Sequence, residues 1–330
     1  MQDRLDWIDT AKGLGIILVV LGHAGRGLSA AGLPDTSGFL VHMDQTIYAF
    51  HMPLFFLLSG ITFGMRPPAN IQPVLIKRSW RLFYVLLIWT YAFLAMRALA
   101  GSSANAGGSW YGLMQAPLPP FGHFWYLWAL LINAAVFALL RLAMPPALRD
   151  AKFWIGAIVL SVCMNMVIRL PQELLPWFSQ ALQYSLVFTV GGLIGASSLL
   201  RLTPSMLIAL IGCILFIAGV WISVTMPLPI NQVTSGLILS LFLMLPLIAL
   251  TNRFSGSKTV AVLAYLGLIS LAIYVMHTMF SAAMRIVLMK AGYTDLALHL
   301  GLSVAVGLCG PLLVYLAAKR FNLLRVMGLG

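Results

Sequence analysis

The fold is decided by apolar stretches such as residues 11–31, AKGLGIILVVLGHAGRGLSAA. This stretch has the length of roughly 20 residues that an α-helix needs to cross the hydrocarbon core of a bilayer. Outward from it, similar apolar runs recur between polar, Pro or Gly breaks, and the sequence predicts an all-α, polytopic membrane protein with about ten transmembrane helices. We expect these helices near residues 11–31, 46–64, 80–100, 122–141, 153–170, 180–199, 206–225, 232–250, 260–283 and 297–318.

The composition excludes a water-soluble fold. Hydrophobic residues make up 61% of the 330 residues and charged residues only 8%, against roughly 25% charged residues in an average soluble domain. The spans leave no room for a large soluble domain, so we expect residues 1–330 to form a single transmembrane domain. A net charge of +12 would suggest nucleic-acid binding in a soluble protein. In a membrane protein, basic residues first indicate how the chain is oriented across the membrane, so we expect no nucleic-acid partner.

The basic residues predict the orientation. When the ten spans are threaded from a cytoplasmic N-terminus, 15 of the 20 Lys and Arg residues fall on the cytoplasmic side. Short cytoplasmic loops retain Lys and Arg, so both termini are expected in the cytoplasm. The five basic residues left outside are Arg26, Arg97, Arg169, Arg285 and Lys290.

Two segments leave other interpretations open. Gly13 to Gly22 followed by small residues could be a cleaved signal peptide, although the acidic residues before it make a poor basic leader. Residues 101–121 form the longest predicted loop, rich in Gly and Ser and then in Pro, and long enough to cover an extracytoplasmic cleft.

Several kinds of site are not indicated. The three cysteines lie in apolar runs without a CxxC pair, so neither a disulfide framework nor a zinc site is expected. The His and Asp positions lack the spacing of metal ligands, and there is no GxxxxGK phosphate loop or GxSxG elbow. We expect no metal.

Lys12 and His23 are the leading functional candidates. An ionisable residue at membrane depth usually faces a protein interior or a watery cavity. Eleven residues of helix separate the two by about 16 Å along the axis and by nearly three whole turns, so their side chains share a face. A single cavity could therefore run from Lys12 to His23, which would lie near mid-bilayer. Alternatively, His23 bonds a neighbouring helix and Lys12 reaches the lipid headgroups.

Further polar groups accompany this pair. Arg78 and Arg81 in KRSWRL, residues 77–82, are three apart and would form a two-guanidinium clamp for phosphate or carboxylate, unless they are ordinary membrane anchors. The run FHMPLFFLLSG, residues 50–60, carries His51 as a cavity-lining or interfacial residue. In the same run Pro53 should bend the helix, and Ser59 with the following Gly should allow close helix approach.

The remaining histidines are less distinctive. We interpret His42, His299 and Glu173 as solvated or packing residues. His123 lies beside Trp125 at the opening of the fourth span, and His277 ends an otherwise apolar stretch. Asp44 could orient a histidine by accepting its ring N–H, although no spacing pairs it with a particular one.

These residues together resemble the acyltransferase family 3 membrane proteins. That family is marked by a basic residue, ten intervening residues and a histidine, which here are Lys12 and His23 within RLDWIDTAKGLGIILVVLGH, residues 4–23. FHMPLFFLLSG is similar to its FFxxSG segment and Arg78 and Arg81 to its RxxR pair. HFWYLWAL at 123–130 and LGLISLAIYVMH at 266–277 are similar to later segments. The Lys in place of the commoner Arg, and its context, look most like the sugar O-acetylase branch, including the fucose acetylases. Unlike some members of the family, this protein is expected to lack an appended extracytoplasmic domain.

The resemblance implies a membrane O-acyltransferase that moves an acyl group, usually acetyl, from cytoplasmic acetyl-CoA to a hydroxyl of a surface carbohydrate or glycolipid. His23 would be the catalytic base or acyl carrier, and Lys12, Arg78 and Arg81 would bind the phosphates of the donor. Supporting roles fall to Asp9, His51, Ser59, Trp125 and His277. The alternatives are a transporter of a lipid-linked sugar or small anionic solute, and a catalytically silent partner in an envelope complex.

Overall fold

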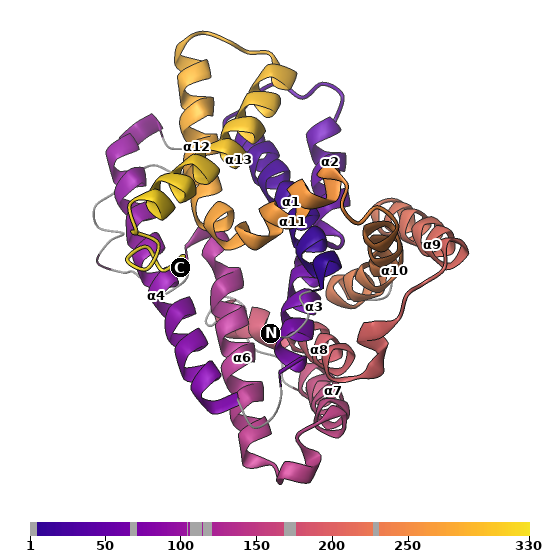
Figure 1. Ribbon diagram of the computed structural model, residues 1–330. Coiled ribbons are helices and arrows are strands. Elements are labelled where there is room, and N and C mark those ends of the chain that lie inside the picture. The colour runs from indigo at the N-terminus through magenta and orange to yellow at the C-terminus, as the bar shows by residue number, and fades with distance from the viewer. Residues whose placement is uncertain are drawn as a thin grey trace.

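The structure, a computed structural model, describes residues 5–66, 71–103, 105, 114, 121–167, 176–226 and 231–330, without the side chains of residues 71–78, 176, 177 and 200. All regular elements in these ranges are helices (Figure 1). The α-helices are α1 (Asp6–Ala30), α2 (Phe39–Tyr48), α3 (His51–Gly64), α4 (Ile71–Ala100), α6 (Trp125–Ala143), α7 (Ala151–Val167), α8 (Pro176–Ala196), α9 (Met206–Thr225), α10 (Gln232–Arg253), α11 (Lys258–Leu268), α12 (Ser270–Lys290) and α13 (Leu296–Arg320). Short 3₁₀ turns lie at η2 (Gly101–Ser103), η3 (Gly122–Phe124), η4 (Pro146–Leu148) and η5 (Ser198–Arg201).

The prediction of an all-α, polytopic membrane protein is confirmed. Within the described ranges, eight helical stretches are long and apolar enough to cross a membrane: α1, α2 with α3, α4 with η2, η3 with α6, α9, α10, α12 and α13. Two further predicted spans, 153–170 and 180–199, correspond to α7, which has 17 described residues, and to α8, which carries two glutamines in its first half. Helices suit this environment because they satisfy every backbone polar group internally.

Two predicted spans are divided. The second begins earlier than expected, as α2, and breaks at Ala49 and Phe50 before α3 starts at His51. Pro53 therefore lies in the first turn of α3, where its missing N–H is tolerated, and the bend predicted for it falls instead at the break. The span predicted at 260–283 is also wrong as one helix, since α11 ends at Leu268 and α12 begins at Ser270.

The helices that carry the candidate residues surround α1. Helix α11 packs along α1, α12 packs against both α1 and α13, and α3 packs on α8 (Figure 1). Gly13 and Gly267 allow α1 and α11 to touch along their backbones, because a Cβ added at Gly267 would lie 1.8 Å from the carbonyl oxygen of Asp9. Helix α9 lies at the periphery. Only 11% of its most apolar 18-residue segment is buried within the protein, as expected of a lipid-facing helix.

Candidate active site

Three cavities lie in series around α1. The first, the Lys12 cavity, has a volume of about 260 Å³ and is bordered by Asp9, Lys12, Ser59 and Tyr126. The second, the central cavity, has about 390 Å³ and is bordered by His23, Tyr48, His123 and Trp125. The third, the Arg285 cavity, has about 370 Å³ and is bordered by Arg26, Arg97, Asn105 and Arg285.

Shared wall residues connect these cavities. Val19, Met52 and Tyr274 border both the Lys12 cavity and the central cavity. His23 and Arg26 border both the central cavity and the Arg285 cavity. Lys12 and His23 border adjoining cavities whose shared wall residues, Val19, Met52 and Tyr274, are called the partition below. One open cavity from Lys12 to His23 stays a prediction.

His23 meets two other histidines from distant parts of the chain. Its ring centroid lies 5.1 Å from that of His277 on α12 and 5.8 Å from that of His123 in η3, and the latter two are 5.1 Å apart. His123 and His277 are buried, whereas His23 is partly accessible to the cavities. In the described part of the chain, no group of three or more His, Cys, Asp or Glu residues is placed to hold a metal ion.

Backbone carbonyls orient the histidine cluster. The Nδ1–H of His277 donates to the carbonyl oxygen of Tyr274 at 2.7 Å. A carbonyl can only accept, so in the neutral ring the proton lies on Nδ1 and Nε2 keeps its lone pair. Nε2 of His277 and Nε2 of His123 are both buried without a hydrogen-bond partner among the described residues. The Tyr274 hydroxyl donates to the carbonyl oxygen of His123 and so ties η3 to α12.

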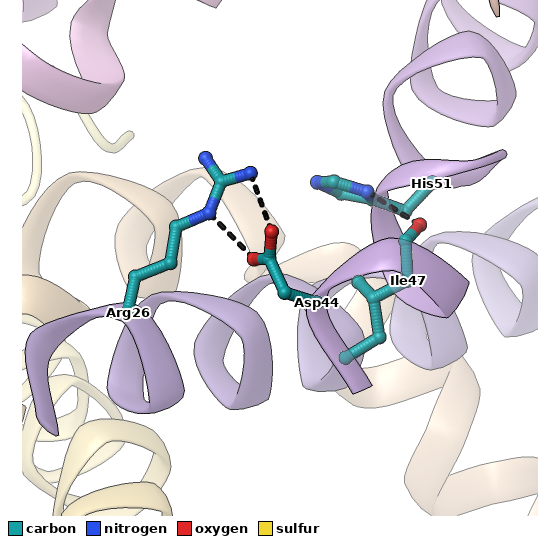
Figure 2. Close-up of polar contacts among 4 residues, drawn as sticks. All are labelled: Arg26, Asp44, Ile47 and His51. Atoms are coloured by element: carbon teal, nitrogen blue, oxygen red, sulfur yellow. Dashed lines mark hydrogen bonds and ion pairs between the residues drawn. The ribbon is translucent and has the colours of Figure 1, made fainter. Parts of the chain in front are cut away.

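Arg26, which borders the central cavity, forms a charged pair with Asp44. Arg26 donates through Nε and Nη2 to the two carboxylate oxygens of Asp44, at 2.5 and 3.0 Å, and Figure 2 shows these groups facing each other. The guanidinium carbon also lies 3.2 Å from the ring centroid of Tyr48. Asp44 therefore orients an arginine, and our expectation that it would orient a histidine is wrong.

His51 is held next to this pair. Its Nδ1–H donates to the carbonyl oxygen of Ile47 at 2.8 Å (Figure 2), and its ring centroid lies 4.3 Å from that of Tyr48. His51 is buried and borders none of the three cavities. The His51 ring therefore packs against the Tyr48 ring without bordering a cavity.

The Lys12 cavity gathers three predicted residues. Lys12 Nζ lies 3.9 Å from a carboxylate oxygen of Asp9, one turn earlier on α1. Ser59 from α3 and Tyr126 from α6 share a hydroxyl–hydroxyl bond of 3.1 Å. The cavity thus offers one ammonium group and a pair of hydroxyls on an otherwise mainly apolar wall.

The predicted arginine clamp is placed only in part. Arg81 lies on α4 beside Leu82, which borders the Lys12 cavity, and its Nε donates to the carbonyl oxygen of Gly328 at 3.1 Å. Arg81 borders none of the three cavities. The side chain of Arg78 lies outside the described residues, as do Glu173 and most of the loop 101–121, so the clamp stays a prediction.

The other predicted positions are spread over the site and its surroundings. Trp125 borders the central cavity. His42 is exposed, with Nδ1 2.8 Å from the carbonyl oxygen of Gly38, and His299 is buried with Nε2 2.9 Å from that of Tyr293. Both match their interpretation as solvated or packing residues.

Sequence reasoning missed several residues that the fold brings to the site. Arg26 could have been found, because it lies three residues after His23 and so about one turn along the same face of α1. Tyr274 likewise lies about one turn from His277 on the same face of α12, three residues before it. The charge pattern assigns Arg285 to an outer loop, but it is a buried residue of α12.

Residues 5–316 match the family described as an acyltransferase domain. The chain belongs to this family. The acyltransferase is also 33% identical over 127 residues to nodulation protein NolL of Sinorhizobium fredii, in an alignment that covers 38% of this chain and 33% of that protein. The chain thus matches about a third of the length of this relative. No solved structure matches.

Proposed function

We propose that this membrane acyltransferase moves an acetyl group from acetyl-CoA to a hydroxyl of a cell-surface carbohydrate or glycolipid, in the bacterial inner membrane. The observation that carries the proposal is the position of His23. It borders the central cavity and the Arg285 cavity, and one partition separates it from the Lys12 cavity. Two substrates can therefore approach the same imidazole from opposite ends of α1.

The Lys12 end suits the donor. Coenzyme A is a polyanion with a long, narrow thiol arm, and Lys12 provides a cation at one end of the cavity series. Helix α1 places His23 about 16 Å further along the axis, a span that an extended arm can cover if the Val19, Met52 and Tyr274 partition opens. Arg78 and Arg81 are proposed to add phosphate contacts outside the cavity.

The chemistry is the transfer of one acyl group and one proton. The acceptor hydroxyl attacks the thioester carbonyl carbon while His23 accepts its proton. The C–S bond then breaks, coenzyme A leaves as thiolate and takes up a proton, and the acyl group remains on the acceptor as an ester. In the rival mechanism a His23 ring nitrogen attacks the thioester carbonyl carbon first, the C–S bond breaks and coenzyme A leaves as thiolate. The acceptor hydroxyl then attacks the acyl-imidazole, the N–acyl bond breaks, and the hydroxyl proton passes to the thiolate or to water.

The neighbouring histidines position His23 in either mechanism. Their rings lie next to that of His23, their Nε2 atoms are buried without a hydrogen-bond partner among the described residues, and the bond from the Tyr274 hydroxyl to the carbonyl oxygen of His123 ties η3 to α12. Buried polar atoms without partners are uncommon in folded proteins. His123 borders the central cavity, and a polar substrate atom is proposed to bind its Nε2 there.

The test compares two histidines of the same protein. His23→Ala should lower acetyl transfer from acetyl-CoA by about 10²- to 10⁴-fold, the usual contribution of a general base. His42→Ala is the matched control, because His42 is exposed and outside all three cavities. Coenzyme A thiol release and ester formation are both measured on purified protein. Full activity in His23→Ala would remove His23 from the mechanism.

A transporter is the second candidate, because cavities in series along one helix also suit a transport path. It would carry a lipid-linked sugar or a small anionic solute and need no thioester. Thiol release from acetyl-CoA by the purified protein separates the two functions, since a transporter produces none.

Trapping of radiolabelled acetyl on a peptide that contains His23, in the absence of acceptor, would distinguish the acyl-imidazole route from the general-base route.

A further inference from the structure

The Arg285 cavity concentrates positive charge next to His23. Arg26 from α1, Arg97 from α4 and Arg285 from α12 all border it. These are three of the five basic residues that the sequence assigns to the outer side. No Asp or Glu occurs among the described residues that border this cavity.

The three arginines differ in how their charge is balanced. Arg26 is already neutralised by the bidentate pair with Asp44. Arg97 has its guanidinium carbon 5.9 Å from the ring centroid of Phe93, a weak cation–π contact. Arg285 is only 7% exposed, and its Nε is buried with no hydrogen-bond partner among the described residues.

A buried guanidinium needs a counter-charge. Arginine stays protonated in proteins, so it cannot relieve burial by losing its proton. An unpaired buried charge is strongly unfavourable. At this burial the Arg285 guanidinium reaches neither the lipid headgroups nor bulk water, as that of an exposed arginine would. An oxyanion inside the cavity would satisfy both the charge and the open Nε donor, and guanidinium groups match phosphate and carboxylate in shape.

We propose that the Arg285 cavity binds an anionic group carried by the acceptor, a phosphate ester or a sugar carboxylate, and so holds the acceptor hydroxyl at His23. The assignment of the anion to the acceptor rests on the proposed acyltransferase function. His23 borders the same cavity as Arg285, so a single molecule can contact both residues. The rest of the wall is mainly apolar, with Phe93, Met96 and Ile286, and its uncharged polar side chains besides His23 are Asn105, Thr278 and Ser281. The strongest contacts it offers are therefore those of the guanidinium groups to an anion.

The test measures anion binding by the purified full-length protein. Glycerol 3-phosphate, glucuronate and glucose are titrated separately, with thermal unfolding as the readout. The phosphate or the carboxylate probe should stabilise the wild type, and glucose should not; the probe that acts identifies the source of the anion. Arg285→Gln should weaken binding of that probe at least about tenfold, and Arg285→Lys by less, since Lys keeps the charge but loses the planar fork.

Two further variants keep the experiment decisive. Lys290→Gln removes an exposed cation from the end of the same helix, outside the cavity, and should bind like the wild type. If Arg285→Gln does not yield folded protein, Arg97→Gln reports on the same cavity and should weaken binding several-fold. Equal stabilisation by glucose, or anion binding that is unchanged in the cavity variants, would overturn the proposal.

Coenzyme A binding on the same samples separates this inference from the proposed function. Arg285→Gln should keep wild-type affinity for coenzyme A, because the Lys12 cavity is untouched. Anion binding that depends on Arg285, in a protein that neither binds coenzyme A nor releases thiol from acetyl-CoA, would support the anion site and refute the acyltransferase function. Coenzyme A binding and thiol release without Arg285-dependent anion binding would support the acyltransferase function and refute the anion site.

Discussion

Gly267→Ala tests how closely the donor end depends on backbone contact between α1 and α11. The added methyl carbon would lie 1.8 Å from the carbonyl oxygen of Asp9 and 3.0 Å from the amide nitrogen of Gly13. The first distance is about 1.6 Å shorter than the 3.4 Å at which ordinary van der Waals contact begins. Both neighbours are backbone atoms, so the strain cannot be relieved by a side-chain rotation, and the two helices must part.

The effect should reach the chemistry as well as the stability. Overpacking of this kind usually lowers the free energy of unfolding by about 1–3 kcal/mol. Gly267 itself borders the Lys12 cavity together with Asp9 and Lys12, so the separation displaces the proposed donor site. A misplacement on the order of 1 Å can lower a rate about 10²-fold, and we expect acetyl transfer to fall by that order while the protein still folds.

Gly301→Ala is the matched control for this experiment. It is the same substitution within a helix, α13, and no atom lies within 4 Å of the added methyl carbon. It should leave transfer unchanged and alter stability by no more than about 1 kcal/mol, in the stabilising direction. Thermal unfolding in detergent and acetyl transfer from acetyl-CoA are measured for both variants. Equal behaviour of Gly267→Ala and Gly301→Ala would refute the reasoning.

Three other outcomes follow from single contacts. Asp44→Asn should lower the free energy of unfolding by less than about 1 kcal/mol, because its pair with Arg26 is partly exposed, but it should strengthen anion binding to the Arg285 cavity by releasing that charge; thermal unfolding with glycerol 3-phosphate checks both. Desolvation raises the pKa of Asp35, but hydrogen bonds from the start of α2 outweigh it and keep the pKa below its usual value. The stabilisation of α2 by the Asp35 carboxylate is therefore fully present above the unfolded-state pKa and is lost as the pH falls through the folded-state pKa. Amide exchange across residues 39–42, corrected for intrinsic rates, should therefore rise at low pH in the wild type and already at neutral pH in Asp35→Asn. Tyr126→Phe removes the bond to Ser59 and should lower stability by about 1 kcal/mol, as measured by thermal unfolding, with a smaller loss of transfer than His23→Ala.

Local sequence patterns were sufficient to predict that the chain is helical and that Lys12 and His23 lie along one helix of the site. The apolar runs predict helices because a bilayer leaves the backbone no other way to satisfy its polar groups. The spacing of Lys12 and His23 depends only on helix geometry, and both residues do border the cavity series. The resemblance to the acyltransferase family is confirmed by the match over residues 5–316.

Contacts between distant segments were not predictable in this way. The breaks near Phe50 and Ile269 lie beside His51 and Pro53 and beside Gly267 and Ser270. Such residues also occur inside membrane helices, so they do not by themselves fix the residue at which a helix ends. The pair of Arg26 with Asp44 joins two helices separated by a loop, and no spacing rule selects it. Arg285 reads as a loop residue in the sequence because charge counting assigns a side of the membrane but does not report burial.

The partition formed by Val19, Met52 and Tyr274 has a consequence for the membrane itself. Two of these three side chains are apolar, and all three are at most 7% exposed. The Lys12 cavity and the central cavity lie on either side of them, each bordered by ionisable side chains, so a continuous file of water through both cavities would give protons a path along α1 with His23 as a relay. Under the proposed function, the same three side chains would have to yield to an acyl group and, between turnovers, keep protons from following that path.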